Sequence, residues 1–81
     1  MRLPRDLSGK ELVRLLRRYG YAPSRQSGSH LQLVSTAKGP EHHVTIPQRS
    51  PLKVGTLAAI LARVAAYLER DREEVAEELF R

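Results

Sequence analysis

A histidine that directly follows a glycine and a serine carries the most versatile chemistry in this sequence. His30 comes after Gly28-Ser29, and Arg25 and Gln32 lie within five residues of it. An imidazole titrates near neutral pH, so it can take up a proton and return it. A guanidinium can neutralise a phosphate group. These two groups suit the cleavage of a phosphodiester whose neighbouring 2′-hydroxyl is the nucleophile, a reaction that needs no metal ion.

A three-stranded meander is predicted to position these side chains. Gly28-Ser29 is typical of a two-residue hairpin loop, and Ala37-Lys38-Gly39-Pro40 is typical of a second turn. The segments His30 to Ser35 and His42 to Pro47 alternate between polar and apolar residues, as half-buried strands do. The strand that ends at Ser27 contains a proline, which cannot donate a ladder hydrogen bond, so we expect this strand at an edge of the sheet.

The two turns also predict a strand register. The first turn pairs Ser27 with His30 and Arg25 with Gln32. The second turn pairs the leucines of the central strand with the apolar residues of the third, so that apolar side chains meet on one face; the predicted pairs are Leu33 with Val44 and Leu31 with Ile46. The opposite face then carries the polar residues Arg25, His30, Gln32, His43 and Thr45. The inner side of the first strand offers only poor core residues, namely Ala22, Ser24 and Gln26.

Amphipathic helices are predicted before and after the meander. Ser8 and Glu11 have the spacing of a capping box, which predicts a helix from Gly9 to Tyr19 that ends at Gly20. Apolar residues return at helical spacing from Val54 to Leu68.

A further cap at Asp71 opens a short helix whose apolar side is Val75, Leu79 and Phe80, unless the preceding helix simply continues. The expected fold class is α+β, in the order α-β-β-β-α(-α). It has an antiparallel three-stranded sheet with helices on one face, and the polar face is left open.

Length and charge limit the class of protein. The 81 residues predict a single domain with a core over about residues 7–68 and an acidic helical extension over about 69–81. Residues 1–68 carry 11 cationic and three acidic side chains, a net charge of +8, whereas residues 69–81 carry −3. A basic body favours a polyanionic partner, chiefly nucleic acid. Without a secretory signal or a long apolar run, we expect a cytoplasmic protein that does not contact the membrane.

No metal ion or other cofactor is expected. The chain has no cysteine, so thiolate metal sites are excluded. His42 and His43 are adjacent in a predicted strand and therefore point to opposite faces, so they cannot readily share one ion. The sequence also has no glycine-rich phosphate-binding loop.

Three stretches of the sequence together resemble the HicA-type mRNA interferase toxins. The first is Arg25-Gln26-Ser27-Gly28-Ser29-His30, which is similar to the arginine and the Gly-Ser-His of that family. The second is Val44-Thr45-Ile46-Pro47, followed by a polar loop and by Gly55-Thr56-Leu57 at the start of a helix. The third is the leading Leu-Ser-Gly-Lys-Glu-Leu helix that ends in Tyr-Gly-Tyr. The resemblance extends from about Leu7 to Val64.

The resemblance implies a fold like that of a double-stranded-RNA-binding domain. It also implies metal-independent cleavage of mRNA with His30 as the catalytic histidine, and a HicB-type antitoxin that covers the active site. The sequence departs from the family in one loop, where relatives often have a histidine and this chain reads Gln48-Arg49-Ser50-Pro51. We predict that RNA is bound by Arg25, Ser29, Gln32, His43, Arg49 and Lys53.

Three functions remain as hypotheses from the sequence. The leading one is a ribonuclease toxin, which rests on Gly28-Ser29-His30 and on the open polar face. The second is an RNA-binding module without catalysis, which the missing loop histidine motivates. The third is a protein-interaction domain, which the acidic C-terminal segment and its apolar residues motivate. The RNA target and the oligomeric state are left open.

Overall fold

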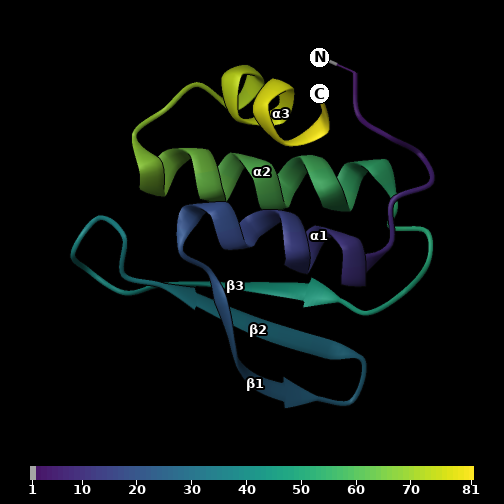
Figure 1. The fold of residues 1–81 in the computed structure, drawn as a ribbon. Coiled ribbons are helices and arrows are strands. Elements are labelled where there is room, and N and C mark those ends of the chain that lie inside the picture. Colours follow the sequence, from purple (N-terminus) through teal and green to yellow (C-terminus); the bar gives the residue numbers. More distant parts are fainter. Residues whose placement is uncertain (1) are drawn as a thin grey trace.

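In a computed structural model, residues 2–81 form an α+β fold with a three-stranded antiparallel sheet and its helices on one side (Figure 1). Met1, the first residue of the predicted domain, lies outside the described residues. The predicted element order is confirmed. The helices are α1 (Gly9–Leu16), α2 (Val54–Leu68) and α3 (Arg72–Phe80), and the strands are β1 (Ala22–Ser27), β2 (His30–Ser35) and β3 (His42–Pro47).

The first helix begins and ends where its capping residues predict. The Ser8 side chain accepts a hydrogen bond from the Glu11 N–H, and the Glu11 carboxylate accepts one from the Ser8 N–H, which completes the capping box. After Leu16 the chain tightens into one turn of 3₁₀ helix over Arg17–Tyr19. Gly20 then ends the helix with a left-handed φ of 84°.

The strand register agrees with the prediction at the site and departs from it near the start of β1. Ser27 pairs with His30 and Arg25 pairs with Gln32, and across the second turn Leu33 pairs with Val44 and Leu31 with Ile46. A β-bulge lies between Pro23 and Arg25. Because the bulge shifts the pairing by one residue, Pro23 lies opposite Leu33, and Ala22 lies opposite Val34 instead of on the inner side. The prediction that Ala22 faces inward was therefore wrong.

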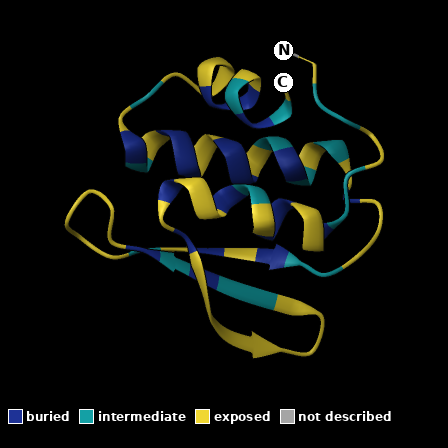
Figure 2. Ribbon diagram, in the orientation of Figure 1, coloured by how far each residue is buried: buried dark blue, intermediate teal, exposed yellow. Residues whose placement is uncertain are grey.

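The core lies between the sheet and the helices, and the other face of the sheet is open (Figure 2). Leu33, Val44 and Ile46 are buried from the sheet side, and Leu12, Leu57 and Leu61 are buried from the helix side. All six residues of β1 are exposed, as expected for an edge strand with few apolar side chains. No helix within the described part of the chain is long and apolar enough to span a membrane.

The C-terminal segment forms a separate helix that joins the same core. Glu69 ends α2 in a left-handed conformation with a φ of 57°, and Asp71 caps α3 by accepting a hydrogen bond from the Glu73 N–H. Val75 and Leu79 are buried, so two of the residues that suggested a protein-interaction surface are instead part of the core. α3 lies on the side of α2 away from the sheet (Figure 1).

Hydrogen bonds of Glu78 link α3 to the rest of the domain. Its carboxylate accepts hydrogen bonds from the Tyr19 hydroxyl and from the Arg70 guanidinium, and its backbone carbonyl accepts one from Arg18. The Arg70 hydrogen bond and then the Tyr19 hydrogen bond lower the pKa of Glu78 to about 2. Burial, together with the adjacent Glu78 carboxylate, raises the pKa of Tyr19 to about 12.

Candidate nucleic-acid interface

A shallow hollow on the open face of the sheet brings together side chains from all three strands. It has a volume of about 250 Å³ and is lined by Arg25, Ser27, His30, Gln32 and Thr45. The pairings Arg25 with Gln32 and Gln32 with Thr45 place these side chains on the same side of neighbouring strands. The strand register thus places an imidazole, a guanidinium, an amide and two hydroxyls around one surface depression.

The backbone of the first turn fixes the position of His30. Gly28 has a φ of 57°, a left-handed conformation that glycine adopts at little cost. The Gln26 side chain donates a hydrogen bond to the Gly28 carbonyl at 3.1 Å, and the Gln48 N–H donates one to the Ser29 carbonyl at 2.6 Å. His30 is the first residue of β2 and is exposed, and within residues 2–81 its ring makes no hydrogen bond. The ring is therefore accessible to a ligand.

The β-bulge in β1 places a hydroxyl against Gln32. The Ser24 hydroxyl lies 3.2 Å from the Gln32 backbone carbonyl and 3.4 Å from its side-chain oxygen, and it donates to both. When the amide oxygen of Gln32 accepts from Ser24, its NH₂ group is free to donate to a ligand in the hollow. Ser24 and Ser27 were absent from the sequence-based prediction of the site. The predicted pairing of Ser27 with His30 was the available signal for Ser27, whereas the bulge gave no signal for Ser24.

The other predicted contact residues lie outside this hollow. Ser29 is in the turn beside His30, and Arg49 and Lys53 are exposed in the loop between β3 and α2. His43 is on the open face but opposite Val34, four residues along β2 from His30. At about 3.3 Å per residue, that spacing puts roughly 13 Å of strand between the two histidines. The hollow therefore brings together Arg25, His30 and Gln32 of the predicted set, and does not include His43.

The neighbouring histidine, His42, has a structural environment. It lies opposite the buried Ser35 on the helix side of the sheet. Its ring stacks on Tyr67 with centroids 4.7 Å apart, and its Nδ1 lies 2.7 Å from the Tyr21 hydroxyl. Burial, followed by the nearby Arg63, lowers its pKa. Across residues 2–81 no group of three potential ligands is arranged to hold a metal ion.

Cationic side chains near the hollow are free of carboxylate partners. The ion pairs found within residues 2–81 join Lys38 to Glu69, His43 to Glu41, Arg70 to Glu78 and Arg81 to Glu77. None of them includes Arg25, Arg49 or Lys53. The positive charge of Arg25, Arg49 and Lys53 is therefore available to an anionic ligand.

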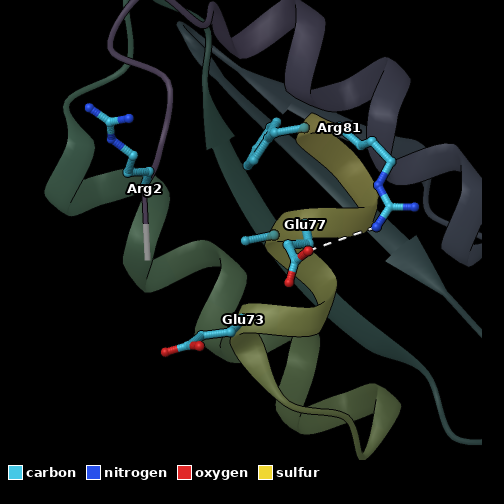
Figure 3. Close-up of a pocket in the computed structure, with 6 residues that line it drawn as sticks. Arg2, Glu73, Glu77 and Arg81 are labelled. Atoms are coloured by element: carbon cyan, nitrogen blue, oxygen red, sulfur yellow. Dashed lines mark ion pairs between the residues drawn. The ribbon is translucent and has the colours of Figure 1, made fainter.

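A separate depression lies on the α3 side of the domain, away from these residues. It is formed between α3 and the N-terminal segment and has a volume of about 320 Å³ (Figure 3). Its charged lining is mixed, because it contains Arg2 and Arg81 as well as Glu73 and Glu77, and the Arg81 guanidinium lies 3.8 Å from the Glu77 carboxylate. None of the predicted site residues lines it. Its balanced charges do not favour a polyanion.

Comparison with known proteins identifies the family. No curated protein and no solved structure matches the chain significantly. Residues 9–65 match the family described as the HicA toxin of bacterial toxin-antitoxin systems. The match covers more than half of the chain, and it includes the hollow, the first turn and the loop after β3. The chain therefore belongs to the HicA toxin family, whose members are the toxins of toxin–antitoxin pairs.

Proposed function

We propose that this protein is a metal-independent endoribonuclease toxin that cleaves mRNA, with His30 as its general acid or base. The observation that carries the proposal is the hollow on the open face of the sheet. There an exposed imidazole lies beside a guanidinium and an amide, and no helix of residues 2–81 covers them. Membership of a toxin family supports the same function.

The residues of the hollow suit transfer of a phosphoryl group to the substrate's own hydroxyl. The 2′-oxygen of the RNA bonds to phosphorus, and the bond from phosphorus to the 5′-oxygen of the next nucleotide breaks. His30 removes the proton from the 2′-hydroxyl or supplies one to the leaving 5′-oxygen, and water serves the other oxygen. Arg25 neutralises the charge that develops on the phosphate, and Gln32 donates to one of its oxygens.

His30→Ala is the primary test of this proposal. A positioned general acid or base contributes about 10²- to 10⁴-fold to a rate, so we expect RNA cleavage to fall by that factor and growth arrest on expression to be lost. RNA decay is measured in the presence of EDTA, because the proposed reaction uses no metal ion. The melting temperature should be unchanged, since the side chain is exposed.

His43→Ala is the matched control for this test. It removes an exposed imidazole from the same face of the sheet but outside the hollow, so any loss should be confined to RNA affinity, and the cleavage rate at saturating RNA should be retained. A His30→Ala protein that is as active and as toxic as the parent would refute the catalytic assignment. Loss of the parent's activity in EDTA would refute the metal-independent reaction.

The proposed partner is a HicB-type antitoxin that covers the hollow. A toxin whose site lies on an open sheet face is inhibited most directly by a protein that occupies this face. Addition of the antitoxin should therefore stop RNA cleavage. Arg25→Glu should weaken the complex, whereas Arg72→Glu on α3, which lies on the far side of the domain, should not.

An RNA-binding module without catalysis is the second candidate. One observation favours it: the His30 ring has no hydrogen-bond partner within residues 2–81 to orient it. The loop after β3 also has Gln48 and Arg49, where the family resemblance leads one to expect a histidine. This candidate predicts RNA binding that weakens with salt, with no cleavage products at any time point. Cleavage that depends on His30 would exclude it.

A further inference from the structure

A second hollow lies at the tip of the β1–β2 hairpin, on the helix side of the sheet. Three segments that are distant in sequence meet there: the start of α1, the end of β1 and the loop after β3 (Figure 1). It has a volume of about 390 Å³. The lining residues are all polar or charged, namely Ser8, Lys10, Gln26, Gln48, Arg49 and Ser50.

Backbone contacts hold this second hollow together. The Gly9 N–H donates to the Arg49 carbonyl at 2.9 Å, and the Leu52 N–H donates to the Leu7 carbonyl at 2.7 Å. These bonds fasten the loop after β3 to the start of α1. They therefore fix the backbones that carry Lys10 and Arg49 next to each other.

The two hollows are separated by the width of one strand. Gln26 lines the second hollow, whereas its neighbours Arg25 and Ser27 line the hollow that contains His30. Adjacent residues of a strand point to opposite faces of the sheet, so the hollows open on opposite sides of β1. β1 is an edge strand, and therefore no further strand blocks the route around its edge.

The second hollow has the chemistry of a phosphate site. Lys10 and Arg49 are exposed and take part in none of the ion pairs found within residues 2–81. The Gln26 and Gln48 amides each donate one hydrogen bond to a backbone carbonyl and keep a second hydrogen for a ligand, and the serine hydroxyls are further donors. The nearby carboxylate of Glu11 accepts a hydrogen bond from the Ser8 N–H and does not line the hollow.

We propose that the substrate is single-stranded RNA, which passes from the His30 hollow around the edge of β1 so that Lys10 and Arg49 bind a neighbouring phosphate. This inference rests on the proposed function, because it places the RNA at His30 first. A flexible single strand can bend around the edge of one β-strand. A duplex is far stiffer than a single strand, so its backbone cannot bend around the edge of one β-strand and enter both hollows. The two hollows thus select single strands over duplexes.

The test measures RNA binding by the full chain with oligonucleotides that cannot be cleaved. The probes are 2′-O-methyl RNAs: a single strand of eight nucleotides, a trinucleotide and a duplex of the octamer sequence. Lys10→Gln/Arg49→Gln is compared with Arg17→Gln/Arg72→Gln, which removes the same charge from exposed residues outside both hollows. Melting temperatures establish that all proteins fold.

The octamer should bind more tightly than the duplex. Lys10→Gln/Arg49→Gln should weaken octamer binding roughly tenfold and make the slope of log affinity against log salt shallower by about 0.7, the value for one phosphate of a single strand that is no longer neutralised. Trinucleotide binding should be unchanged, because so short a strand occupies only the His30 hollow. The control variant loses the same net charge, and this loss alone should weaken octamer binding by no more than roughly twofold.

The outcomes separate this inference from the proposed function. If cleavage of unmodified RNA depends on His30 but the two double variants bind the octamer equally well, the second phosphate site is refuted and the proposed function stands. Tighter binding of the duplex than of the octamer refutes the selection of single strands. If the parent neither binds nor cleaves RNA, both proposals are refuted.

Discussion

The two faces of the sheet are formed by alternating residues of the same strands, but they differ in almost every physical property. On the helix side Leu33, Val44 and Ile46 are at most 2 % exposed and contact the helices. On the open side Arg25 and His30 are exposed, and their neighbours are polar. A one-residue step along a strand therefore separates the part of the molecule that stabilises the fold from the part that is available to a ligand. Substitutions at adjacent positions should separate stability from RNA cleavage.

Leu33→Ala and Gln32→Ala should give the sharpest contrast. Leu33 is fully buried, so its truncation should lower the free energy of unfolding by about 2–5 kcal/mol, comparable to the total stability of a domain of this size. Gln32→Ala should change stability by less than about 0.5 kcal/mol and should slow RNA cleavage by roughly tenfold or more, because it removes a donor to the phosphate. Urea unfolding and cleavage rates test the pair. A destabilised Gln32→Ala protein would contradict the separation of the two faces.

Gly9→Ala tests how closely the helix side packs. A Cβ at this position would lie 2.1 Å from the Pro47 carbonyl oxygen and 3.1 Å from its carbon, so backbone must move. We expect a loss of about 1–3 kcal/mol in the free energy of unfolding, despite the better helix propensity of alanine.

Gly55→Ala is the matched control in α2. A Cβ there meets nothing within 4 Å, so the substitution should stabilise the protein by about 0.5–1 kcal/mol. Equal effects of the two substitutions in thermal unfolding would show that the start of α1 does not pack closely on the end of β3.

Glu78→Gln tests how the helix side retains α3, and its effect should depend on pH. The folded pKa of Glu78 is lowered to about 2 from an ordinary value of 4.5, so its charged form stabilises the fold fully above about pH 4.5. This stabilisation is lost as pH falls from about 4.5 through 2. The variant should therefore melt at a lower temperature than the parent at pH 7, and the difference should shrink toward pH 2. A difference that is constant with pH would contradict the ion pair with Arg70.

The positions of the secondary structures were largely predictable because local signals determine them. The Ser8–Glu11 capping box, the left-handed Gly20 and the apolar pairing across the second turn predicted α1 and the register of β2 with β3. The grouping of Arg25, His30 and Gln32 followed from that register. Such features depend on residues close in sequence, or on strands joined by a short turn.

Features that depend on long-range contacts were not predictable in the same way. The bulge at Ser24 has no local signature, yet it changes which residue of β1 faces inward. The left-handed Glu69 separates α2 from α3 without a glycine, so the alternative of one continuous helix stayed open from the sequence. The position of Lys10 beside Arg49 depends on hydrogen bonds between segments 40 residues apart. For that reason the sequence predicted Arg49 as an RNA contact but did not place Lys10 beside it.

The proline and the bulge of β1 also bear on how this protein behaves at high concentration. A strand that borders solvent exposes backbone groups on which another chain can extend the sheet, and this is a common start of aggregation. Pro23 has no N–H to offer to an incoming strand, and the bulge that follows it interrupts a continuous intermolecular ladder. The edge strand around which RNA is proposed to bend is therefore interrupted as a template for another chain at its first residues.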